Sequence, residues 1–101
     1  MKVRNLESPR TGRPVPNQFT ITHNGKTYFQ SYESLIAEYD GERLTLGCDF
    51  DYSVTTAKYL NVWMRENCLR IWYDLPDGKS FSDRLRKAIK AGQINYNSDM
   101  V

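Results

Sequence analysis

Few side chains of this sequence have the types and spacing that catalysis requires. The only histidine, His23, directly precedes an Asn24-Gly25 pair that favours a tight turn, so imidazole chemistry would have to take place at a hairpin tip. No Gly-x-Ser-x-Gly elbow or cysteine-protease signature surrounds a candidate nucleophile. The glycines are scattered, and none opens a phosphate-binding loop. The sequence therefore predicts a protein without catalytic residues or a cofactor, which is not an enzyme.

Two carboxylates and one thiol are the remaining chemical candidates. Asp49 and Asp51 would lie on one side of an extended segment, where they could together contact one Mg²⁺ or Ca²⁺. Two carboxylates do not form a complete site, so we favour a structural role in a turn before a helix, whose N-terminus attracts negative charge. Both carboxylates would raise the pKa of Cys48 and make its thiol unreactive. No metal site is predicted.

Charge is distributed unevenly along the chain, although the formal net charge is only +2. Residues 1–17 contain four basic and one acidic side chain, whereas residues 33–51 contain six acidic and one basic. The acidic residues, which we predict to bind a partner protein, are Glu33, Glu38, Asp40, Glu42, Asp49 and Asp51. A surface of carboxylates can compete with nucleic acid for a basic channel in such a partner.

An alternative interpretation is a nucleic-acid-binding accessory protein. Its phosphate contacts would come from Arg4, Arg10, Arg13, Arg84, Arg86, Lys87 and Lys90. Its stacking rings would come from Tyr28, Tyr32, Tyr52, Tyr59 and Trp72. The net charge is far below that of a typical nucleic-acid binder, which favours a solvated basic helix face and rings in the core.

The pattern of β-branched residues, aromatic residues and turns predicts an α+β fold. Asn24-Gly25 suits the positive φ angles of a type I′ turn, and Asp40-Gly41 is expected to turn the chain by the same chemistry. The predicted strands of a four-stranded antiparallel meander cover residues 18–23, 26–32, 34–39 and 42–46.

Two helices are expected to cover one face of this sheet. Ser53 is a candidate N-cap for a helix through residue 67, and the capping box from Ser80 to Asp83 begins a helix over 81–91. Residues 69–75 fit either a short strand or a helical extension, of which we favour the extension. Residues 94–96 predict a short C-terminal strand.

Residues 1–17 contain three prolines and are predicted to form an extended arm beside a single domain over residues 18–101. The arginines of this arm, Arg10 and Arg13, either serve binding to a partner or nucleic acid or pair with Asp49 and Asp51, and of these we favour the pairing. The start of the chain lacks a secretory signal, no apolar run approaches the roughly 20 residues of a membrane span, and two cysteines do not make a disulfide framework. These features predict a cytoplasmic protein.

Three long strings carry a resemblance to a known group of proteins. They are NLESPRTGRPV followed by NQF in residues 5–19, GKTYFQSY with SLIA in residues 25–37, and DYS, TT and KYLN in residues 51–61. In them the chain resembles a family of small bacteriophage and mobile-element proteins, and it departs from that pattern in residues 65–78. The resemblance implies a protein that acts by binding in the bacterial host cell, including as an inhibitor of a CRISPR effector nuclease.

Overall fold

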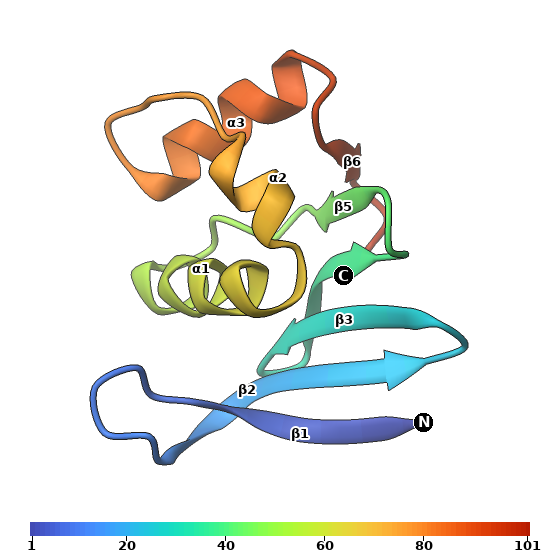
Figure 1. Ribbon diagram of the computed structural model, residues 1–101, viewed down its shortest axis with the longest axis vertical. Helices are drawn as coiled ribbons and strands as arrows, with labels where there is room; N and C mark the ends of the chain where they lie inside the picture. Colours follow the sequence, from blue (N-terminus) through green and yellow to red (C-terminus); the bar gives the residue numbers. More distant parts are fainter.

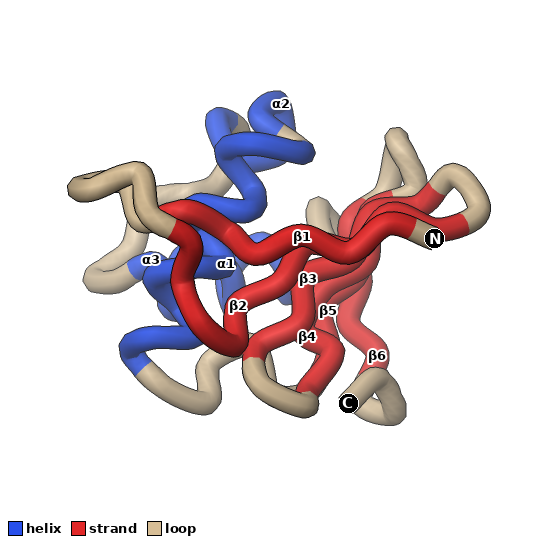
Figure 2. Tube along the Cα trace, turned by 90° about the horizontal axis from the view of Figure 1, so that it is seen from below, coloured by secondary structure: helices blue, strands red, loops and turns tan.

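The computed structural model of the protein describes all residues, 1–101, as a six-stranded sheet with three helices (Figure 1). The elements in chain order are β1 (Lys2–Glu7), β2 (Pro14–His23), β3 (Lys26–Ser31), β4 (Ser34–Tyr39), β5 (Leu44–Gly47), α1 (Val54–Asn67), α2 (Leu69–Tyr73), α3 (Phe81–Lys90) and β6 (Asn95–Asn97). Figure 2 shows the helices gathered on one side of the strands. The predicted α+β class is confirmed, but the sheet has more strands than expected.

The sheet keeps the order of the chain. Strands β1 to β5 form an antiparallel meander, and β6 adds to the edge of the sheet parallel to β5. The connection from β5 to β6 contains all three helices, in agreement with the rule that parallel neighbours need a long crossover. The predicted C-terminal strand is confirmed one residue further along, and Ile94, which precedes it, belongs to the hydrophobic core.

The N-terminal segment is not an arm, and this prediction was wrong. Strand β1 pairs with β2 from Lys2 opposite Thr22 to Glu7 opposite Pro14, and the side chain of Leu6 is completely buried in the core. The three prolines do not prevent this pairing. One lies in the β1–β2 loop, one is the first residue of β2, and one lies at the register shift between the two strands. The segment is extended, as predicted, but it is an edge strand of the sheet.

The first predicted turn has the expected geometry. Asn24 and Gly25 both have positive φ, 52° and 77°, and the β2–β3 hairpin closes with His23 opposite Lys26.

The second turn differs from the prediction. Gly41 has a φ of 100°, but Asp40 caps a four-residue connection by accepting hydrogen bonds from the backbone N–H groups of Glu42 (2.8 Å) and Arg43 (2.7 Å). These bonds, that of Arg43 first, lower the pKa of Asp40. Strand β5 consequently begins at Leu44 rather than at residue 42.

Helix α1 supplies much of the core. Ser53 caps it as predicted, since its hydroxyl accepts a hydrogen bond from the backbone N–H of Thr56 (3.1 Å). Trp63 is fully buried, stacks on Phe29 with 6.3 Å between ring centroids, and donates from Nε1 to the Thr20 hydroxyl at 3.2 Å. Fully burying a side chain as large as phenylalanine contributes about 1.5–3 kcal/mol relative to leaving it exposed, and tryptophan is larger still.

Helices α2 and α3 complete the layer of helices on one side of the sheet. Residues 69–73 form the short helix α2, which confirms the helical extension. Ser80 caps α3 by accepting from the backbone N–H of Asp83 (3.1 Å), whereas the Asp83 carboxylate accepts from Lys79 rather than from Ser80. Within the chain, none of the helices is long and apolar enough to cross a membrane.

Candidate functional site

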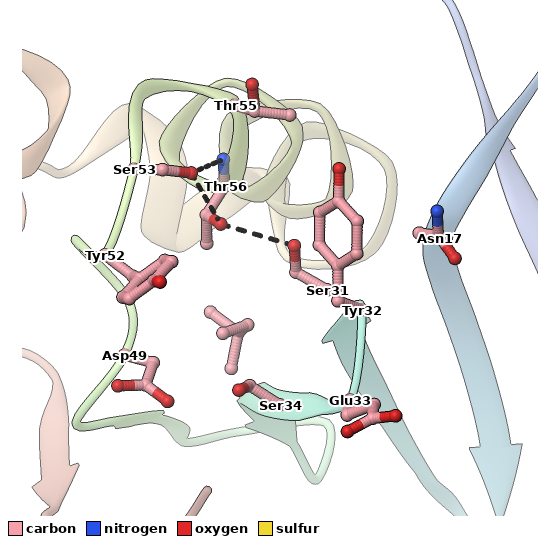
Figure 3. Close-up of a pocket in the computed structure, with 11 residues that line it drawn as sticks. Asn17, Ser31, Tyr32, Glu33, Ser34, Asp49, Tyr52, Ser53, Thr55 and Thr56 are labelled. Atoms are coloured by element: carbon pink, nitrogen blue, oxygen red, sulfur yellow. Dashed lines mark hydrogen bonds between the residues drawn. The ribbon is translucent and has the colours of Figure 1, made fainter.

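A polar cavity of about 730 Å³ opens at the N-terminus of α1 (Figure 3). It lies between this helix end, the β3–β4 turn and the loop that follows β5, and its volume falls in the range of roughly 300–1,000 Å³ typical of ligand pockets. The lining residues are Asn17, Ser31, Tyr32, Glu33, Ser34, Ile36, Asp49, Tyr52, Ser53, Thr55 and Thr56.

Two residues of the cavity wall adopt left-handed backbone conformations that side chains other than glycine rarely take. Tyr32 has a φ of 56° and Asn17 a φ of 65°, and the backbone N–H of Tyr32 donates to the Asn17 carbonyl at 2.6 Å. Tyr32 and Glu33 form the tight turn between β3 and β4, because Ser31 pairs with Ser34. A left-handed conformation costs about 1–2 kcal/mol in an ordinary residue, and such strain is concentrated at functional sites.

A chain of hydroxyl groups forms the wall between α1 and β3. Ser53 donates to the Thr56 hydroxyl at 3.1 Å, and the hydroxyls of Thr56 and Ser31 lie 3.2 Å apart (Figure 3). These groups satisfy one another and attach the first turn of α1 to the sheet. The lining contains no histidine, and neither of its carboxylates, Glu33 and Asp49, is hydrogen-bonded to one of these hydroxyls as a general base for a hydroxyl nucleophile would be.

The cavity is electrostatically negative. Glu33 and Asp49 are its only charged side chains, and neither belongs to one of the protein's three ion pairs. The N-terminus of α1 contributes only about half a positive charge against two full negative charges. The site therefore attracts cations.

The predicted acidic residues do not form one surface. Only Glu33 and Asp49 meet at the cavity. Glu38 lies 3.8 Å from Lys26, Asp51 lies 2.8 Å from Arg86, Asp40 caps a turn, and Glu42 is exposed beside that turn. The predicted pairing of Asp49 and Asp51 with Arg10 and Arg13 was wrong, because the β1–β2 loop holds both arginines and α3 supplies the partner of Asp51.

The predicted basic residues are also dispersed. Arg84 donates from Nε to the Pro76 carbonyl (2.9 Å), Arg86 pairs with Asp51, and Lys87 lies 3.5 Å from Asp83. Lys90 belongs to the same helix, whereas Arg4 is in β1 and Arg10 and Arg13 are in the β1–β2 loop. This loop and α3 lie at opposite ends of the molecule in Figure 1. The structure therefore does not bring the seven basic residues together.

Neither thiol has the environment of a reactive cysteine. Burial first, and then the Asp49 carboxylate, raise the pKa of Cys48, while burial alone raises the pKa of Cys68 to about 12. The predicted effect of Asp49 on Cys48 is thus confirmed in direction. No three His, Cys, Asp or Glu side chains are grouped to hold a metal ion, and His23 is exposed at its hairpin tip.

Gln18 lies behind the cavity wall, opposite Ser31 in the β2–β3 register. Its side chain is 1% exposed, and neither polar atom of its amide has a hydrogen-bond partner within the chain. Neither this buried amide nor the Tyr32-Glu33 turn was predicted from the sequence. The buried amide could have been recognised from the sequence, because Gln18 occupies an inward-facing position in the alternating pattern of β2. The Tyr32-Glu33 turn could not, because it contains no glycine or asparagine.

Fold and site together define a small α+β protein with an acidic, tyrosine-flanked surface cavity. The chain belongs to a family of unknown function (DUF8033), whose model matches residues 1–74. The match includes every residue that lines the cavity and ends before α3. No curated protein and no solved structure matches the chain.

Proposed function

We propose that this is a non-enzymatic binding protein that acts through protein–protein contact at the mouth of the acidic cavity. The observation that carries the proposal is the exposure of Tyr32 (57%), Tyr52 (78%) and Val54 (87%) around one end of α1. Tyr32 and Tyr52 both line the cavity, and Tyr52 and Val54 line the neighbouring hollow, so the three form one patch. Exposed apolar side chains with a polar rim mark interaction sites, and tyrosine is enriched among binding hot spots.

A specific form of this proposal is inhibition of a host defence complex. It rests on the resemblance to phage and mobile-element proteins, and it places the protein in the cytoplasm of a bacterial host cell. The carboxylates at the cavity mouth would occupy basic residues with which a CRISPR effector nuclease holds its nucleic acid.

Binding to nucleic acid is the weaker alternative. Three of the four basic residues that were predicted in α3 already contact acceptors within the protein. Affinity for DNA or RNA that falls steeply with salt concentration would support this alternative and count against the protein–protein proposal.

The experiment measures cleavage by purified effector nucleases of the bacterial host with and without the protein. We expect the protein to inhibit an effector, and we expect the double variant Tyr52→Ser/Val54→Ser to lose inhibition at an unchanged melting temperature. The control is Tyr73→Ser, which removes an exposed ring (70%) from α2, outside the cavity lining. Neither binding to nor inhibition of any effector, or equal loss in the control, would contradict the proposal.

A further inference from the structure

The two exposed rings of the cavity stand on opposite sides of its opening. Figure 3 shows Tyr52 on one side and Tyr32 on the other, with Asp49, Ser34 and Glu33 along the rim between them. The hydrogen bond from the Tyr32 backbone N–H to the Asn17 carbonyl supports the left-handed backbone from which this ring projects. The opening is therefore flanked by an aromatic ring on either side.

The charge of the rim selects a cation. Glu33 is exposed and Asp49 is partly buried, and no lysine or arginine of the chain neutralises either of them. The only donor to the Asp49 side chain within the chain is the weak Cys48 thiol at 3.7 Å. The acceptor capacity of both carboxylates therefore remains available to an incoming group.

The geometry favours a guanidinium over the other common cations. A bare metal ion would need more ligands than two carboxylates, and the aromatic rings would not contribute to its binding. A lysine ammonium is a strongly hydrated point charge, whereas the planar guanidinium stacks on aromatic rings and donates from five N–H groups in a fixed fork. The cavity volume of about 730 Å³ also has room for residues that flank the arginine.

We propose that the cavity binds an arginine side chain on an exposed loop or tail of the partner protein, with its guanidinium between the Tyr32 and Tyr52 rings and its N–H groups directed to Glu33 and Asp49. This inference rests on the proposed function and identifies the chemistry of the partner at the same site.

The test is an NMR titration of the isotope-labelled full chain with the capped peptide Gly-Arg-Gly. We expect shifts confined to the amides of residues 31–34 and 49–56. The same peptide with citrulline, which keeps the shape without the charge, should bind about tenfold more weakly, and the lysine peptide should fall between the two.

Two matched double variants locate the binding. Glu33→Gln/Asp49→Asn should lower the affinity for the arginine peptide about tenfold. Glu42→Gln/Asp77→Asn removes two exposed carboxylates away from the cavity lining and should leave the affinity within a factor of about two, as expected of screened surface charge. Tyr52→Phe should retain binding, and Tyr52→Ser should reduce it.

Three results would overturn the inference: equal binding of the arginine and citrulline peptides, equal effects of the two double variants, or no shifts at high peptide concentration. Such a failure differs from failure of the proposed function. If Tyr52→Ser/Val54→Ser loses nuclease inhibition while no arginine peptide binds, the contact surface stands and only its arginine anchor is wrong.

Discussion

The buried amide of Gln18 leads to a prediction whose sign differs from that of most core substitutions. Its side chain is 1% exposed on the helix-facing side of β2, and neither its oxygen nor its nitrogen has a partner within the chain. Leaving buried polar groups without partners costs about 1–3 kcal/mol. Replacing the amide by an apolar group of similar shape removes that cost, so we expect a more stable protein.

The substitution Gln18→Met keeps an unbranched side chain of similar length and removes both polar atoms. We expect the free energy of unfolding to increase by about 1–2 kcal/mol. For a domain of this size each kcal/mol raises the melting temperature by about 4–8 °C. Urea titration should show a higher midpoint with an unchanged slope, since the surface exposed on unfolding stays the same.

Thr20→Val is the matched control on the same face of β2, two residues away. Its hydroxyl accepts the 3.2 Å hydrogen bond of Trp63 Nε1, so the valine variant leaves that buried N–H without an acceptor. We expect it to lose about 1–3 kcal/mol. The two variants should therefore move in opposite directions. If Gln18→Met is also destabilising, the amide has a partner outside the chain, such as a buried water, and the reasoning fails.

Three further substitutions test other features of the fold. Gly47→Ala would place a Cβ atom too close to the backbone oxygens of Met100 and Leu35, so urea denaturation should show a loss of about 1–3 kcal/mol in the free energy of unfolding. An unchanged midpoint would mean that these two segments do not pack against Gly47. Leu6→Ala should cost about 2–5 kcal/mol in the same assay if β1 belongs to the core, whereas a detached arm would show no change. The pKa of Asp83 is lowered from its usual value of 3.8, first by the backbone N–H of Lys79, so the stabilisation by its charge is present above pH 3.8 and is lost as the pH falls through the lowered value. Asp83→Asn should accordingly be less stable than the natural chain at pH 7 and approach it in acid, and a constant difference at all pH values would contradict this cause.

Local structure was largely predictable from the sequence. Asn24-Gly25 specifies its turn because both residues accept positive φ, and Ser53 and Ser80 specify helix starts because each hydroxyl reaches a backbone N–H three residues later. Each of these features depends on residues that are neighbours in the chain. The α+β class follows from the same signals.

Tertiary structure alone decided which distant segments meet. The prolines of residues 1–17 argued against a strand, but none of them lies within β1, which pairs with the edge of β2 and buries Leu6 in the core. Strand β6 pairs with β5 although a connection that contains all three helices separates the two strands in the chain.

The candidate site also depends on which distant segments of the chain meet. Its acidic residues are close in sequence, yet only Glu33 and Asp49 face one cavity, because Asp51 is drawn to Arg86 of α3 and Glu38 to Lys26 of β3. The sequence determined the Asn24-Gly25 turn, the helix caps and the charges available, since these depend on neighbouring residues. The pairing of those charges and the cavity itself depend on packing between residues far apart in the chain, which only the complete fold defines.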